Sequence, residues 1–176
     1  GLMATRAVDD RAGCAALLAA ALRVDWGRAQ DKTVTFAWDV QEETGLFGAA
    51  ELAKNFKPDY VFAIDTFVSS DSPLESRRFA YTVIGRGAVI RAIDSSSVVP
   101  KAALRKVLAV AARHGLPVQV GSSRGGNDGS VFLPGGSVDV PLSWPGAYAH
   151  SLIEKIDRRD LEALTDLILA LVEGWR

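Results

Sequence analysis

The chain has 176 residues, a formal net charge of −1 and 48% hydrophobic residues, which is the composition of a soluble globular domain. This balance argues against a nucleic acid or an anionic membrane surface as partner, and no apolar run reaches the roughly 20 residues that span a bilayer. Cys14 is the only cysteine, so no intrachain disulfide can form and we expect a cytoplasmic protein.

Residue patterns predict alternating strands and helices within a single domain. Helices are expected at 15–23, 47–55, 100–112 and 159–173, and strands at 33–40, 60–64, 79–84, 88–93, 117–120 and 138–142. Gly85 and Gly87 join two of these strands, which favours an antiparallel hairpin. Strand and helix alternation favours a largely parallel sheet with helices on both faces. The expected fold is a three-layer α/β/α sandwich with a mixed, mainly parallel sheet.

Acidic or imidazole side chains occur where the predicted strands end or helices begin. The sites are Asp9-Asp10, Glu42-Glu43, Asp65 and His150, and elements that finish at one edge of a sheet bring such residues together. Carboxylates with an imidazole are suitable ligands for Zn²⁺, Co²⁺ or Mn²⁺. Clustered carboxylates otherwise repel one another unless they are protonated. Adjacent glutamates at a strand end point in different directions, so one can bind metal while the other acts on water.

Each feature also has a simpler interpretation when taken alone. Asp9-Asp10 could be a helix cap, Glu42-Glu43 a solvated turn, and the glycine-rich stretch 121–129 either a flexible loop or a backbone cradle for a substrate. That stretch is not a P-loop, because no Lys-Ser/Thr pair follows its glycines. Ser123 and Ser151 have no convincing nucleophile context.

Taken together, these segments resemble the dinuclear metallo-aminopeptidases of the glutamyl-aminopeptidase and deblocking (tetrahedral) aminopeptidase family, some of which are labelled endoglucanase or cellulase. The clearest match is Val-Gln-Glu-Glu-Thr-Gly-Leu-Phe-Gly at 40–48. The other matching segments are 7–14, 63–65, 85–87 with Asp94, 125–128 and 148–151. They extend over nearly the whole chain and are specific as a set.

The resemblance implies a site with two divalent ions, Zn or Co before Mn. Asp9 would bridge the ions, Glu43 and His150 would ligate one of them, and Asp65 would ligate the other. Glu42 would be the general base and acid of the hydrolysis.

The resemblance also implies a peptide substrate with a free N-terminus. Gly125, Gly126 and Asp128 would line the substrate cleft. The full-length protein would form a homo-oligomer, with neither nucleic acid nor membrane as partner.

The sequence departs from the family in its first residues. A further metal-binding histidine and an inserted β domain precede the Asp9 segment in family members, and neither occurs here. We therefore expect a truncated catalytic domain from a longer protein. One ion would keep Asp9, Glu43 and His150, and the other, with only Asp9 and Asp65, would bind weakly or not at all.

Two smaller departures concern substrate recognition. Ala147 stands where an arginine is common, and Asn127 where a threonine is usual. Two alternatives remain open. One is a hydrolase-fold module with impaired or no catalysis, and the other is a related dimetal carboxypeptidase or amino-acid deacylase.

Overall fold

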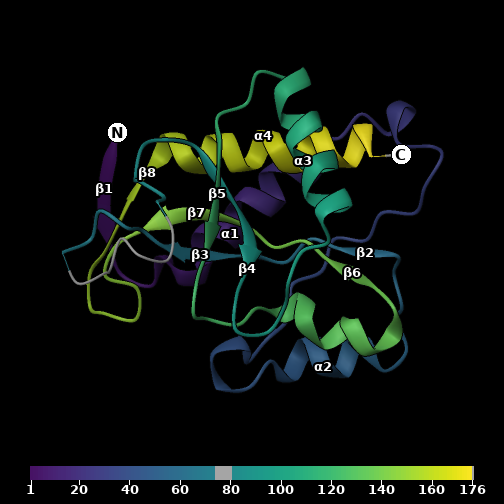
Figure 1. Ribbon diagram of the computed structural model, residues 1–176, viewed down its shortest axis with the longest axis horizontal. Coiled ribbons are helices and arrows are strands. Elements are labelled where there is room, and N and C mark those ends of the chain that lie inside the picture. Colours follow the sequence, from purple (N-terminus) through teal and green to yellow (C-terminus); the bar gives the residue numbers. More distant parts are fainter. Residues whose placement is uncertain (74–80, 176) are drawn as a thin grey trace.

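The protein is described by a computed structural model that covers residues 1–73 and 81–175 (Figure 1). Its centre is a four-stranded sheet in the order β3-β7-β4-β5. The strands are β3 (Ile64–Val68), β4 (Ala88–Ile93), β5 (Val118–Ser122) and β7 (Leu142–Gly146). β3 runs parallel to β7 and β4 parallel to β5, whereas β4 and β7 are antiparallel.

Two smaller sheets extend this arrangement. β2 (Tyr60–Val61) pairs in parallel with β6 (Val138–Asp139), and β1 (Leu2–Thr5) pairs antiparallel with β8 (Glu154–Asp157). Parallel pairings thus outnumber antiparallel ones among the described strands, and the predicted mixed, mainly parallel α/β fold is confirmed.

Helices lie on both sides of the central strands in Figure 1, with α3 and α4 above and α2 and the 3₁₀ helix η3 below. The α-helices are α1 (Val8–Ala21), α2 (Phe47–Ala53), α3 (Lys101–Arg113) and α4 (Arg158–Gly174). The 3₁₀ helices are η1 (Trp26–Arg28), η2 (Glu42–Thr44) and η3 (Asp128–Gly135). Among the described helices, none is long and apolar enough to cross a membrane.

The main core lies between the sheet and helices α1, α3 and α4. In α4, Leu164, Leu167, Ile168 and Leu171 recur at helical spacing and are at most 5% exposed, so one stripe of the helix is buried against the sheet. Trp144 of β7 is completely buried in the same core. This packing fixes α1 beside β3, and the candidate site lies near the start of that helix.

The predicted helices are all present. α1 begins seven residues before the predicted range 15–23, and the other ends differ by at most two residues. The predicted strands 60–64 and 138–142 each divide into two, β2 with β3 and β6 with β7. β3 continues through Asp65 to Val68 because β7 runs beside it as far as Gly146. Asp65 therefore lies within a strand, and the expectation that the strand ends there is wrong.

Two predicted strands are not formed as expected. Residues 33–40 belong to no strand, because none of the described residues pairs with them in a ladder. β-branched and aromatic residues favour a strand only where a neighbouring strand accepts its hydrogen bonds. Tyr81 to Ile84 also lie outside any strand, and β4 pairs with β5 and β7, so the predicted hairpin is wrong. Residues 79 and 80 lie outside the described part.

Candidate metal centre

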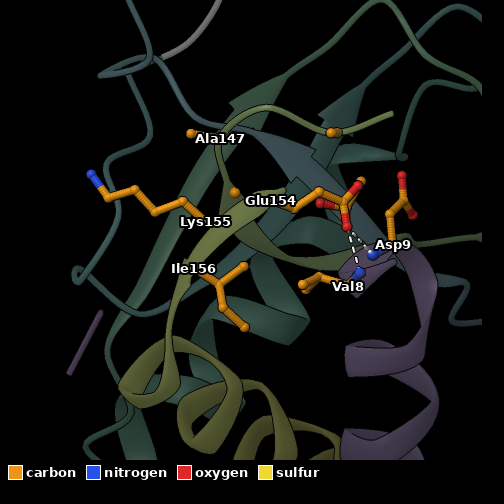
Figure 2. A pocket seen from close by; sticks show the side chains of 9 residues that line it. Val8, Asp9, Ala147, Glu154, Lys155 and Ile156 are labelled. Carbon is orange, nitrogen blue, oxygen red and sulfur yellow. Dashed lines mark hydrogen bonds between the residues drawn. The ribbon is translucent and has the colours of Figure 1, made fainter. Parts of the chain in front are cut away.

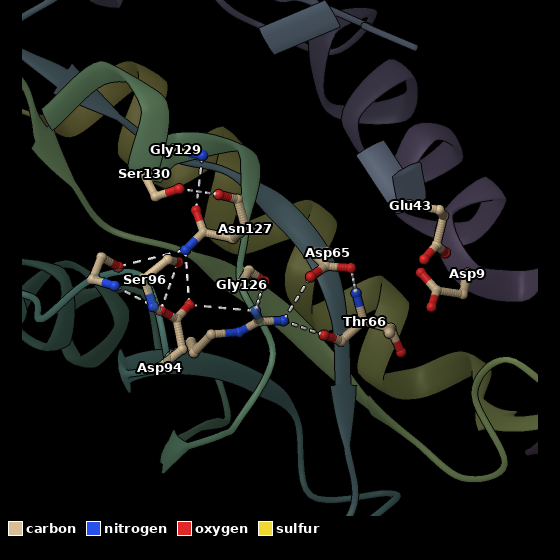
Figure 3. Close-up of polar contacts among 12 residues, drawn as sticks. Asp9, Glu43, Asp65, Thr66, Asp94, Ser96, Gly126, Asn127, Gly129 and Ser130 are labelled. Atoms are coloured by element: carbon tan, nitrogen blue, oxygen red, sulfur yellow. Dashed lines mark hydrogen bonds and ion pairs between the residues drawn. The ribbon is translucent and has the colours of Figure 1, made fainter. Parts of the chain in front are cut away.

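Asp9 and Asp10 begin α1 in a conformation that is not helical. Asp9 has φ −76° and ψ 110°, Asp10 has φ −112° and ψ 30°, and the peptide bond between them is cis. Ala7 before them has a left-handed backbone with φ 50°. The predicted role of this pair as a simple cap is therefore incomplete, because the turn directs the Asp9 carboxylate toward Glu43 (Figure 3).

Glu42 and Glu43 lie on the 3₁₀ helix η2 rather than at a strand end. Gln41 before them has φ 63°, and Gly45 after them has φ 132°. Gly45 suits this position because a side chain would be strained at such a φ. The tight turn presents both carboxylates at its start, so the expectation that they follow a strand end is wrong.

Asp9, Glu43 and His150 converge from three separate segments. His150 Nε2 lies 3.3 Å from Asp9 Oδ2 and 3.2 Å from Glu43 Oε2. Each residue offers one ligand atom, and these atoms all lie within 4.8 Å of one another. The Asp9 side chain is 7% exposed, whereas those of Glu43 and His150 are 54% and 70% exposed. We call this group the His150 cluster.

A second group, which we call the Asp65 cluster, contains Asp9, Asp10 and Asp65, again with ligand atoms within 4.8 Å of one another. Arg91, 3% exposed, reaches the Asp65 Oδ2 atom with its Nη2 at 2.8 Å. The other terminal nitrogen of Arg91 donates to the Gly126 carbonyl at 2.7 Å. A fixed guanidinium thus already balances part of the negative charge of this cluster.

Burial makes the carboxylates of the site hard to ionise. It raises the pKa of Asp9 to about 7, with smaller contributions from Asp65 and Glu43. Burial followed by the charges of Asp65 and Asp9 raises the pKa of Asp10 to about 9. Glu42 has its pKa raised to about 7, first by burial and then by Asp65 and Glu43. The group therefore favours bound protons or a cation over full ionisation.

The chemistry of the donors fits a divalent ion of the Zn or Co type. Two carboxylates and one imidazole are a typical protein ligand set for such ions. In the His150 cluster all three donors point at one another over short distances without a lysine or arginine between them among the described residues. The Asp65 cluster offers only carboxylates, one of which is held by Arg91.

The glycine-rich loop lies on the far side of Asp65 (Figure 3). Asn127 caps η3 by accepting the Gly129 N–H at 2.8 Å, and its amide donates to Asp94 at 2.8 Å. Asp128 begins η3, and its pKa is raised to about 7 by burial and then by Asp39, Glu42 and Asp65. The loop that contains Gly125, Gly126 and Asp128 therefore borders the acidic site.

Two residues of this region were not among the sequence predictions. Arg91 lies within the apolar strand Ala88–Ile93, and Glu154 begins β8 and is 5% exposed. A charged residue inside an otherwise apolar strand was the available signal, because such a residue is seldom buried without a partner. The partner itself could not be read from the sequence.

Comparison with known proteins gives a consistent result. Residues 1–167 match the family described as M42 glutamyl aminopeptidase. A curated relative from Acetivibrio thermocellus is 32% identical over 172 residues, which are 96% of this chain and 50% of that protein. The TET1 peptidase of Pyrococcus horikoshii, which can assemble into a tetrahedron or a large octahedral shell, is 38% identical with a TM-score of 0.88, over 98% of this chain and 50% of that one.

A third similar structure is described as an endoglucanase of Thermotoga maritima. It is 28% identical with a TM-score of 0.68, over 98% of this chain and 50% of that one. The chain thus spans about half the length of the relatives that it matches.

Proposed function

The chain belongs to the M42 glutamyl aminopeptidase family, and we propose that it supplies the base and most of the metal ligands of a metal-dependent aminopeptidase. The observation that carries this proposal is the His150 cluster, in which Asp9, Glu43 and His150 offer ligand atoms within 4.8 Å of one another. Glu42 precedes Glu43 on the same 3₁₀ turn. In this proposal, a carboxylate that transfers protons therefore lies next to one that ligates metal.

In this proposal Asp9, Glu43 and His150 hold one divalent ion, and Asp9 with Asp65 holds a weaker second one. A bound ion supplies Lewis-acid activation of water and of the scissile carbonyl. Zn or Co suits the mixed carboxylate and imidazole donors, and Mn is the third choice.

Glu42 performs the proton transfers. It accepts a proton from the attacking water and returns one to the leaving amine. A pKa of about 7 suits both directions, because a group that titrates near the working pH both accepts and donates readily.

The peptide binds beside this site. We assign Gly125, Gly126 and Asp128 to the wall of the substrate cleft, because their loop is joined through Arg91 to Asp65. Asp128 offers an acidic group that suits the free α-amine of a peptide. We also propose that the whole protein forms a homo-oligomer, as its Pyrococcus relative can assemble into a tetrahedron or a large octahedral shell.

The experiment compares Glu42→Gln with the wild-type chain in Zn²⁺ or Co²⁺, with aminoacyl-nitroanilides as substrates. We expect hydrolysis to fall about 10²–10⁴-fold in the variant while calorimetry shows unchanged metal affinity. Glu51→Gln is a matched control, because the Glu51 side chain is 70% exposed and pairs only with Lys54 among the described residues. Full activity in Glu42→Gln would contradict the assignment.

One observation favours a second candidate, a metal-binding module of the same fold without catalysis. Arg91 pairs with Asp65, so part of the negative charge at one of the two ion positions is already balanced. A wild-type chain that binds one equivalent of Co²⁺ and hydrolyses no substrate, beside an active full-length relative, would support the module. Equal hydrolysis of N-acetylated peptides would instead support the carboxypeptidase or deacylase alternative, because only an aminopeptidase requires the free amine.

A further inference from the structure

Glu154 joins two parts of the metal centre that are remote in sequence. Its carboxylate lies in a small pocket between the start of α1 and strand β8 (Figure 2). Oε2 accepts the Val8 N–H in a short hydrogen bond and the Asp9 N–H at 3.0 Å. Oε1 accepts the His150 N–H at 3.1 Å. One carboxylate thus bonds to the main chain at two of the three members of the His150 cluster.

Both segments that Glu154 holds have unusual backbones. On one side, Ala7 has φ 50° and precedes the non-helical turn at Asp9. On the other side, Tyr148 has φ 67° and His150 itself has φ 63°. Left-handed backbone is unfavourable for residues with a side chain and persists only where surrounding contacts enforce it. The three N–H bonds to Glu154 are contacts of this kind.

The carboxylate of Glu154 accepts hydrogen bonds from these donors, and the described residues show no other role for it. It is 5% exposed, and among the described residues it forms no ion pair with lysine, arginine or histidine. It is also absent from both groups whose atoms could hold a metal. Hydrogen bonds from N–H groups to a carboxylate are about twice as strong as neutral ones, so the three together hold the two segments firmly.

We propose that Glu154 is a positioning residue of the metal centre. By fixing the main chain at Asp9 and at His150, it sets these two side chains opposite each other before an ion arrives. The inference rests on the proposed metal site and adds a residue that acts only through other residues. Replacing a group that bonds to a metal ligand and orients it typically changes the metal affinity about 10–100-fold.

Glu154→Gln is the informative substitution. The amide keeps the shape of the side chain but presents one oxygen and one NH₂ group. It can therefore accept from Val8 and Asp9 or from His150, but not from both. A main-chain N–H that is left without the oxygen then faces the NH₂ group, which is itself a donor. The hydrogen-bonded link between the two segments is therefore lost.

Asp160→Asn is a matched control. The Asp160 carboxylate is completely buried and accepts the Gly85 N–H at 2.6 Å and the Gly87 N–H at 2.7 Å. It is thus another buried carboxylate that bonds to the main chain, but it lies in α4 and outside both acidic clusters. The same chemical change is made there without touching the site.

Binding of Co²⁺ is measured by calorimetry and by its visible absorption spectrum, which depends on ligand geometry. We expect Glu154→Gln to raise the Kd about 10–100-fold and to change the spectrum. Asp160→Asn is expected to lower the urea midpoint while keeping the wild-type Kd and spectrum. If Glu154→Gln does not fold, Glu154→Asp replaces it, because its shorter carboxylate cannot reach both segments.

Each outcome decides the proposal. A folded Glu154 variant with the wild-type Kd and spectrum overturns it, as does an Asp160→Asn chain that loses affinity to the same extent. A wild-type chain that binds no Co²⁺ refutes the metal centre itself, and the positioning role with it. That result differs from the first, in which the wild type binds Co²⁺ and the variant binds it equally well.

Discussion

The two clusters that share Asp9 differ in how their negative charge is balanced. In the His150 cluster, an exposed imidazole lies 3.3 Å from Asp9 and 3.2 Å from Glu43. In the Asp65 cluster, the buried Arg91 guanidinium lies 2.8 Å from Asp65. The first cluster faces solvent through Glu43 and His150, and an ion can enter between its donors. The second already contains a fixed cation.

This difference separates a position suited to a metal ion from one that already contains a cation. A guanidinium cannot give up its proton in a protein and has no lone pair to offer, so Arg91 orients Asp65 but adds no ligand. His150 offers a nitrogen ligand whenever it is neutral. A single side chain, Asp9, therefore belongs both to a site suited to metal and to a charge network that spans Asp65, Arg91 and Asp94.

Arg91→Met should have the largest effect on stability. The substitution keeps the aliphatic part of the side chain, but it removes the guanidinium and leaves Asp65 and Asp94 buried without their cation. Breaking a buried ion pair from one side costs about 3–5 kcal/mol. We expect a loss of that size in urea unfolding. Arg23→Met is the control, because the Arg23–Asp166 pair is exposed at 53% and 43% and should be worth less than about 1 kcal/mol. If both variants lost the same unfolding free energy, the buried Arg91 would no longer distinguish the Asp65 cluster from the His150 cluster.

His150→Ala should have the next largest effect, on metal affinity. It removes one of the three donors of the His150 cluster. The Kd for Co²⁺ should therefore rise by more than the roughly 10–100-fold that is typical when a residue that only orients a ligand is replaced. Asp65→Asn is the counterpart in the other cluster and should leave the first binding event nearly unchanged. Calorimetric titration of both variants measures the contrast. If Asp65→Asn weakens that event as much as His150→Ala does, the Asp65 side holds the tighter ion.

The members of the His150 cluster were predictable as a set but not from their local structure. Asp9, Glu43 and His150 were identified from motif order, and the structure brings their ligand atoms together. The expected reason for the Glu42 and Glu43 geometry was a strand end, whereas a 3₁₀ turn provides it. A pattern of residue types stays informative when the predicted element is wrong, because it depends on the chemical groups of the site and not on the helix or strand that carries them.

The contacts behind the ligands were not predictable from the sequence. Arg91 and Glu154 each bond to partners that are remote along the chain, namely Asp65 for the first and Val8 with Asp9 for the second. The periodicity of apolar residues identifies which face of a strand is buried, but it does not identify the charged residue that lies opposite that face. The strand expected at 33–40 failed for a related reason, since a ladder requires a partner strand that local propensity cannot reveal.

A further expected effect is a dependence of stability on pH in the metal-free chain. Burial raises the pKa of Asp9, Glu42 and Asp128 to about 7, above ordinary values of 3.8 for Asp and 4.5 for Glu. The native state therefore retains protons that the unfolded chain releases. These groups therefore make their full contribution to stability below about pH 4. That contribution is lost as the pH rises toward and through 7.

With EDTA present, the Tm should consequently fall between pH 5 and pH 8, by about 2–4 °C for each kcal/mol lost in a chain of this size. Zn²⁺ or Co²⁺ should restore the Tm more at pH 8 than at pH 5, because the ion must displace protons at the lower pH. Asp9→Asn removes the carboxylate common to both clusters, so its Tm should depend less on pH and respond little to the ion. A metal-free Tm that rises from pH 5 to pH 8 would show that the shared carboxylates are already ionised, with Arg91 and His150 compensating them in both clusters alike.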